Sequence, residues 1–241
     1  MTEPAPRVQI EKLRAGMQRQ LEIRQQAIAA GVASAGWKVA INVPEVQRRL
    51  GLPHAALGWI RGDRVLTSGA EIAAPSGSQL CVEAEAAVRI DGPVPPRASV
   101  AVARGSIDAV YPALELVDYA RPSASLDDLL SHSVFHAGCV LGSPLTLEDW
   151  ERLPRDRPRL FIGDTQIART RHDLVPDDLG RVVSFVARYL SHLDLALESG
   201  DLILAGCYMD RATPVRDDQR VCADFGSAGD VELRVSGAPT S

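Results

Sequence analysis

Apolar side chains recur at helical spacing over the first part of the chain. From residue 6 to about residue 30 they follow one another every three or four positions among Arg, Gln and Glu, which predicts an amphipathic helix that Gly31 ends. A strand-like run, GWKVAINV, follows at residues 36–43. Pro44 then opens a second predicted helix, PEVQRRLGL, because proline is favoured in a first helical turn. Residues 1–67 are therefore expected to form a helix-rich, peripheral N-terminal segment.

Beyond Gly58 the pattern changes to short apolar runs separated by Gly, Pro and Ser, which is typical of strands. The predicted strands cover residues 64–67, 79–90, 99–104, 109–117, 159–162, 202–205, 220–225 and 231–235. One more helix is predicted over residues 176–197, where apolar side chains gather on one face. These elements predict an α+β fold with a mainly antiparallel or mixed sheet, and residues 68–241 form its β core.

The composition is that of a globular protein. The chain has 241 residues, of which 46% are hydrophobic and 24% are charged, so it can bury a core and is not expected to be disordered. Its longest stretch without a charged side chain, residues 132–147, is broken by Ser, Gly and Pro, so no membrane span is predicted. The first dozen residues lack the apolar centre of a secretion signal, which favours a cytoplasmic protein. Its four cysteines have no CxxC spacing, which argues against a zinc ribbon or a disulfide framework.

Charge and aromatic content argue against a nucleic-acid partner. The formal net charge is -5, and only 5% of the residues are aromatic, too few for base-stacking platforms. Only two of the 26 basic residues are lysines, Lys12 and Lys38. Lys38 lies in an apolar run, and a buried lysine can lose its proton and act as an acid or base, unlike arginine. The alternative is an ordinary surface lysine whose stem packs on apolar neighbours.

Three glutamates are candidates for binding a metal ion. Alternation along residues 82–90 places Glu83 and Glu85 side by side on one face of a predicted strand. Two adjacent carboxylates repel each other unless solvent, an arginine or a cation offsets their charge, and Mg or Mn is one solution. Glu115 lies among apolar residues and is expected to be partly buried. If its strand lies beside that of Glu83, the three could hold one ion with positions open for a bidentate substrate. A solvated polar face, or a pairing with arginine, remains open for each carboxylate.

His132, His136 and Cys139 have the i, i+4, i+7 spacing that would place them on one side of a helix. Such a set could hold zinc or copper, but a zincin helix also needs a glutamate beside its first histidine, and Cys139 lies in an apolar run. We favour the interpretation that at least one of these histidines lines the active site. No G-x-S-x-G elbow, Walker loop or G-x-G-x-x-G is present, so the sequence does not support a serine hydrolase or a nucleotide-binding protein.

Six segments together resemble the fumarylacetoacetate hydrolase superfamily, and within it the 2-keto-4-pentenoate (2-hydroxypenta-2,4-dienoate) hydratases and their decarboxylase relatives. They are GWKVAINVPEVQRRLGL, IRGDRVLTSGAEI, CVEAEAAVRI, YPALELVD, GDLILAG and ADFGSAGDVELRV, in this order along the chain. The likeness runs from about Gly16 to Val235. It implies a rolled mixed β-sheet core with peripheral helices and a helical N-terminal segment. It also implies a homo-oligomer.

The resemblance also implies the roles of particular residues. Glu83, Glu85 and Glu115 match the ligands of a Mg or Mn ion, while Lys38 and Asp63 match a proton-transfer pair. The implied substrate is a small 2-oxo or 2-hydroxy acid.

The segment after Glu115 departs from the hydratase pattern. His132 and Ser133 stand where the hydratases have an Asp-Asn pair, and the usual tryptophan is missing. The expected substrate-binding residues are therefore Arg121, His132, Ser133 and Gly206, and His136 joins the expected catalytic residues.

The sequence thus predicts a metal-dependent hydratase (lyase) that adds water at the conjugate position of a 2-hydroxy-dienoate or 2-oxo-enoate through a chelated enolate. A 2-oxo acid decarboxylase and an acylpyruvate-type C–C bond hydrolase, in which His132 or His136 would activate water, are the enzymatic alternatives. A biosynthetic rather than a degradative pathway is also open because of the altered segment. The non-enzymatic alternative is a non-catalytic partner subunit.

Overall fold

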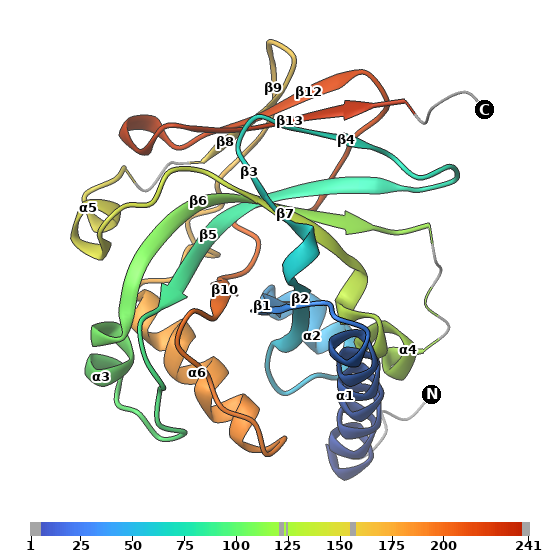
Figure 1. Ribbon diagram of the computed structural model, residues 1–241, viewed down its shortest axis with the longest axis vertical. Coiled ribbons are helices and arrows are strands. Elements are labelled where there is room, and N and C mark those ends of the chain that lie inside the picture. Colours follow the sequence, from blue (N-terminus) through green and yellow to red (C-terminus); the bar gives the residue numbers. More distant parts are fainter. Residues whose placement is uncertain (1–5, 121–122, 124, 155–157, 238–241) are drawn as a thin grey trace.

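The computed structural model describes residues 6–120, 123, 125–154 and 158–237, which form two β-sheets with helices around them. In Figure 1 the larger sheet curls through the middle of the molecule and the smaller sheet lies across its top. Helices α1 (Pro6–Ala29) and α6 (Leu179–Ser191) stand below the larger sheet on opposite sides (Figure 1). The curl gives the larger sheet a concave side. The strands of this sheet carry the residues of the candidate site described below.

Both sheets are mixed. The larger sheet has eight strands, in the order β2 (Ala56–Arg61), β1 (Ser34–Ala40), β10 (Leu202–Leu204), β5 (Leu80–Ile90), β6 (Ile107–Asp118), β7 (His136–Leu141) and β3 (Val65–Thr67), with β11 (Thr213–Pro214) also pairing with β5. The smaller sheet has the order β4 (Ala70–Ala73), β13 (Asp230–Ser236), β12 (Gln219–Asp224), β8 (Arg159–Ile162) and β9 (Thr165–Arg169). Three pairs are parallel, β1–β10, β3–β7 and β4–β13, and the other neighbours are antiparallel.

The helices follow local capping chemistry. α2 (Pro44–Leu50) has proline in its first turn and ends at Gly51, whose φ of 66° is left-handed. α6 starts after Asp178, whose carboxylate accepts the backbone N–H of Gly180, so this helix is shorter than the predicted span of 176–197. The other short helices are α4 (Leu126–Ser131), α5 (Leu147–Glu151) and the 3-10 turns η1 (Gly62–Arg64), η2 (Ser133–Phe135) and η3 (Gly226–Ala228).

The strand predicted over residues 99–104 is wrong. This segment forms the helix α3 (Val100–Gly105). The hydroxyl of Ser99 accepts the N–H of Val102 and caps the helix, and the alternating Val and Ala residues suit a short helix as well as a strand.

Two of the three buried hydrophobic clusters in the described part of the chain hold the layers together. The first lies between the larger sheet and helices α1 and α6, and it includes Met17, Trp37 and Val186. The second includes Val82 and Leu114 of the larger sheet and Leu233 of the smaller one, so it fills the space between the sheets. Strands β5 and β6 contribute to both cores, which makes this pair the central support of the molecule.

The α+β class is confirmed, with a rolled mixed sheet, surrounding helices and a helical N-terminal segment. The N-terminal third is less peripheral than expected, because β1 and β2 are buried members of the larger sheet. The division at residue 67 stays a prediction. Among the helices in the described part of the chain, none is long and apolar enough to cross a bilayer.

Candidate active site

The pairing of β5 with β6 brings three glutamates together. Glu83 lies directly opposite Glu115 in the strand register, and Glu85 follows on the same face two residues later. One carboxylate oxygen from each lies within 4.8 Å of those of the other two. Glu85 and Glu115 are 0% and 2% exposed, and Glu83 is partly buried. The convergence expected from the sequence is therefore present in the structure.

Lys38 and His136 both donate to the same oxygen of Glu115. The ammonium of Lys38, from β1, pairs with Glu115 Oε1 and also donates to the carbonyl of Val134 at 3.0 Å. His136 begins β7, and its Nδ1 is 2.8 Å from Glu115 Oε1. Nδ1 therefore carries the proton, and Nε2 is buried without a partner among the described residues. Lys38 is 2% exposed, so it is not a surface lysine.

Burial and mutual repulsion separate the pKa values of the three carboxyl groups. Burial alone would raise the pKa of Glu115, but the Lys38 ammonium and the hydrogen bond from His136 outweigh it and lower the pKa to about 2. Burial and the nearby Glu115 charge raise the pKa of Glu83 to about 7. The same two causes raise the pKa of Glu85 well above its usual range. Burial lowers the pKa of His136, although Glu115 opposes this, so the imidazole is neutral at pH 7.

This donor set fits a hard divalent cation. Glu85 Oε2 accepts the backbone N–H of Gly206 at 2.6 Å, while its Oε1 is buried and has no hydrogen-bond partner among the described residues. Three buried carboxylates without enough positive charge around them must take up protons or bind a cation. Carboxylate oxygens are the ligands that Mg and Mn prefer. Glu83, Glu85 and Glu115 therefore have the chemistry and the spacing of a metal site.

A cavity of about 560 Å³ is lined by Glu83, Glu115 and Lys38. Apolar side chains form most of its wall, and the rings of Tyr119 and Phe135 meet edge to face there with centroids 4.9 Å apart. A volume of this size suits a small organic molecule. The chain therefore places a carboxylate cluster, a lysine and an apolar wall in one cavity.

One wall of this cavity is a strained turn that sequence reasoning missed. Ser133, Val134 and Phe135 have left-handed φ values of 52°, 51° and 64°, which cost energy in residues other than glycine. Lys38 holds the Val134 carbonyl, and the Ser133 hydroxyl accepts the N–H of Trp59 at 3.2 Å. Nothing in the local composition signals this turn, because the contacts that impose it come from β1 and β2.

The structure places Asp63, His132 and Ser133 outside the glutamate cavity. Asp63 lies in η1, where its carboxylate pairs with Arg61 at 2.8 Å and is 46% exposed, and it does not line the cavity. His132 and Ser133 line a neighbouring cavity of about 870 Å³, which shares Phe135 with the first and also borders His136.

The structure also places the remaining candidate residues. His132, His136 and Cys139 do not share a helix, because His136 and Cys139 lie in strand β7. Gly206 contacts the cluster through its N–H. Arg121 lies outside the described residues. The roles of Asp63, His132, Ser133, Gly206 and Arg121 stay predictions.

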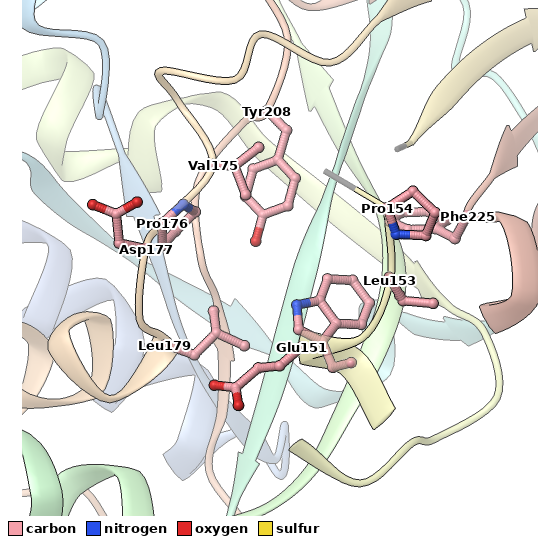
Figure 2. A pocket seen from close by; sticks show the side chains of 10 residues that line it. Glu151, Leu153, Pro154, Val175, Pro176, Asp177, Leu179, Tyr208 and Phe225 are labelled. Carbon is pink, nitrogen blue, oxygen red and sulfur yellow. The ribbon is translucent and has the colours of Figure 1, made fainter. Parts of the chain in front are cut away.

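A third cavity lies elsewhere in the fold. Figure 2 shows this space of about 190 Å³, with the Tyr208 hydroxyl pointing between Leu179 and Glu151, and Phe225 on its other side. None of the predicted site residues that the structure describes lines it. A second possible metal group in the described part of the chain, Cys222, Asp230 and Glu232, is partly exposed. The buried glutamate cluster is therefore the candidate active site.

The fold of this chain is similar to that of several solved protein structures. No protein-family model and no curated protein sequence matches the chain. 4-Oxalocrotonate decarboxylase from Pseudomonas putida G7, complexed with magnesium and adipate, matches with a TM-score of 0.80 and 18% identity over 90% of this chain and 83% of that chain.

Two other solved structures extend the comparison. Fumarylpyruvate hydrolase from Pseudomonas aeruginosa, in complex with Mn²⁺ and pyruvate, matches with a TM-score of 0.66 and 17% identity over 86% of this chain and 91% of that chain. 2-Hydroxyhepta-2,4-diene-1,7-dioate isomerase from Mycobacterium marinum matches with a TM-score of 0.63 and 18% identity over 87% and 78%. All three belong to the fumarylacetoacetate hydrolase superfamily. The resemblance seen in the sequence is thus confirmed at the level of the fold.

Proposed function

We propose that this protein is a divalent-metal-dependent enzyme that acts on a 2-oxo acid, or on its 2-hydroxy-dienoate tautomer, by stabilising the enolate. The observation that carries the proposal is the cluster of Glu83, Glu85 and Glu115, whose oxygens lie within 4.8 Å of one another beside a buried lysine and a cavity. The structural neighbours complexed with magnesium and with Mn²⁺ support it. All three carboxylates that are expected to bind the metal are present, which argues against a non-catalytic partner subunit.

The three glutamates would hold Mg or Mn in this cavity. When bound, such an ion supplies the Lewis acidity that favours negative charge on the 2-oxygen and carboxylate of the substrate. The protein's own part is to orient these carboxylates. Lys38 and His136 fix Glu115 and keep it deprotonated, and the Gly206 N–H fixes the orientation of Glu85.

Lys38 is the candidate for proton transfer. Its ammonium lines the cavity and is fixed by Glu115 and by the Val134 carbonyl. A positive charge at this position favours an enolate in the cavity, and Nζ can deliver a proton to the substrate carbon and take one back. The apolar walls exclude water and strengthen both effects.

Water addition at the conjugate position is the reaction that the sequence predicts. It needs a base to activate water, and the expected second member of the pair, Asp63, pairs with Arg61 outside the cavity. Decarboxylation is the second candidate. The structural neighbour 4-oxalocrotonate decarboxylase, with a TM-score of 0.80, supports it. It needs an enolate and a proton donor but no activated water, which Lys38 alone can serve. The homo-oligomeric state and the cytoplasmic location stay predictions.

The test is turnover by the purified protein with and without Mn²⁺. The substrates are 2-hydroxypenta-2,4-dienoate and 4-oxalocrotonate, their loss is followed in the ultraviolet, and products are identified by mass. Gain of one water identifies a hydratase, and loss of carbon dioxide identifies a decarboxylase. The Glu83→Gln variant is expected to lose Mn²⁺ binding and at least about a hundredfold in turnover, since the Lewis acid contributes several kcal/mol.

Glu71→Gln is the matched control, because Glu71 is an exposed glutamate on β4 outside the cavity. It should leave Mn²⁺ binding and turnover unchanged. Turnover that survives in Glu83→Gln would remove the glutamate cluster from the mechanism.

A further inference from the structure

The wall of the glutamate cavity changes in chemistry from its buried end to its exposed end. Lys38 and Glu115 are buried, whereas two other residues that line the same cavity, Arg49 and Arg211, are exposed to solvent. The two arginines come from opposite parts of the chain, one from α2 and the other from the segment after β10. Two guanidinium groups therefore border the mouth of a cavity whose base is the candidate metal site.

The helix α2 directs Arg49 to the cavity by its periodicity. Val46, Arg49 and Leu50 line the cavity, and their i, i+3, i+4 spacing places them on one face of the helix. Arg48, one residue earlier, does not line the cavity and pairs instead with Glu45 on the exposed side. Adjacent arginines on this helix thus have different surroundings.

The charges of the two arginines that line the cavity are not paired with those of other described residues. No other described residue forms an ion pair with Arg49 or Arg211. Asp210 is the acid beside Arg211 in the chain and lines the same cavity, but its carboxylate pairs with Arg171 at 3.0 Å. The exposed end of the cavity therefore carries two guanidinium groups that no acidic side chain of the described chain offsets.

Apolar side chains line the same cavity. Ile41, Leu129, Val134 and Met209 line it together with the arginines, Glu83 and Glu115. A substrate that reaches from the buried glutamates to the exposed arginines therefore also meets apolar side chains. The complementary molecule has an anionic group at each end of a short carbon chain.

We propose that Arg49 and Arg211 bind the far-end carboxylate of the substrate, so that the enzyme selects 2-oxo dicarboxylates over 2-oxo monocarboxylates. The assignment rests on the proposed function for the position of the 2-oxo acid end. Guanidinium groups bind carboxylates through charged, paired hydrogen bonds, which suits this role better than a lysine would. Arg49 and Arg211 are in this view specificity-determining residues and take no part in the proton transfer.

The test compares two acids of equal length that differ only at the far end, 2-oxohexanedioate and 2-oxohexanoate. Their affinity for the Mn²⁺-loaded protein is measured by calorimetry. The diacid is expected to bind about tenfold more tightly. A hydrogen bond to a charged group contributes about one to two factors of ten in affinity. The Arg49→Gln/Arg211→Gln variant should lower the affinity for the diacid to that for the monoacid and leave the affinity for the monoacid unchanged. The preference should also shrink at high salt, since the mouth is exposed.

Arg48→Gln is the matched control and should change neither affinity. Because all three arginines are exposed, Mn²⁺ affinity and the melting temperature should stay at wild-type values in both variants and exclude misfolding. Mn²⁺-dependent binding of both acids with equal affinity would overturn the arginine assignment and leave the proposed function intact. Absence of Mn²⁺-dependent binding of either acid would overturn the proposed function, and the arginine assignment with it.

Discussion

Gly206 shows how much one backbone position contributes to the candidate site. Its φ of +102° lies in the region that favours glycine, and its N–H donates to Glu85 Oε2. A Cβ at this position would lie 2.9 Å from Cγ and Nδ2 of Asn42, whose amide in turn donates to the Cys207 carbonyl. The absence of a side chain therefore allows this turn to approach both Glu85 and Asn42.

Gly206→Ala is expected to destabilise the protein by about 2–3 kcal/mol, from backbone strain and from the contact with Asn42. It should also weaken Mn²⁺ binding about tenfold, since displacement of the N–H releases the Glu85 carboxylate. Thermal unfolding and Mn²⁺ titration measure the two effects.

The Gly69→Ala variant is the control for Gly206→Ala. It separates the cost of backbone strain from the cost of the contact with Asn42. Gly69 has a similar φ of +90°, and a Cβ there would meet nothing within 4 Å. It should cost about 1 kcal/mol and leave Mn²⁺ affinity unchanged. Equal losses in the two variants would show that the contact with Asn42 and the bond to Glu85 contribute little.

At the scale of elements, the docking of α1 depends on a buried amide. The side chain of Gln20 is 1% exposed, and its Nε2 donates to the Leu57 carbonyl at 3.2 Å and to the Leu130 carbonyl at 2.5 Å. One glutamine thus joins α1 to β2 and α4. α4 leads into the strained turn at the cavity wall, so this contact also supports the site.

Gln20→Leu should destabilise the protein by about 1–3 kcal/mol, because it leaves two buried carbonyls without donors. Denaturant unfolding with the slope held constant measures the change. Gln18→Leu, on the exposed side of the same helix, is the control and should shift stability by less than about 0.5 kcal/mol. A stable Gln20→Leu protein would mean that apolar contacts alone dock α1.

The elements that the sequence predicts well are those whose own periodicity decides their structure. The first helix ends at Ala29 as Gly31 indicates, and the long strands β5 and β6 follow the alternation of their apolar residues. α3 was missed because a run of Val and Ala fits either state until Ser99 caps it. The spacing of His136 and Cys139 also fits a helix, but the pairing of β7 with β6 fixes a strand.

The residues of the candidate site also differ in how far local sequence patterns predict them. Glu83 and Glu85 could be paired from local alternation, and Glu115 from its apolar surroundings. The bonds from Lys38 and His136 to Glu115 join residues 77 and 21 positions apart and depend on the curl of the sheet, which no local pattern encodes. Asp63 pairs with Arg61, two residues away in the chain, and this ion pair holds its carboxylate outside the cavity.

At the scale of the whole molecule, the glutamate cluster should make stability depend on pH and on metal. Glu83 has a pKa of 4.5 when unfolded and about 7 when folded, so between these values the folded state holds a proton that the unfolded state lacks. The stability that this proton contributes is complete below 4.5 and is lost as the pH rises to about 7. Glu85 acts in the same direction, and Glu115 in the opposite one, because its lowered pKa contributes stability that is lost only in acid.

The metal-free protein is therefore expected to lose on the order of 3 kcal/mol of stability from Glu83 between about pH 5 and about pH 7.5. Mn²⁺ should reverse this loss, adding about 2.7 kcal/mol at a hundred times its dissociation constant. Melting temperatures measured across this range with and without Mn²⁺ test both effects. Glu83→Gln should flatten the metal-free slope, and an unchanged slope would mean that Glu83 titrates normally in the folded protein.

The three-residue strand β10 gives the molecule a particular order of assembly. It inserts between β1 and β5, so that Gly36 pairs with Leu202 in the middle of the larger sheet. Contacts between such distant parts of the chain form slowly, because the intervening loop must close first. The strands with Glu83, Glu85 and Glu115 leave the ribosome long before residues 202–206 close the sheet and supply the Gly206 N–H. We therefore expect the candidate metal site to be completed late in folding, because Gly206 follows Glu115 by 91 residues along the chain.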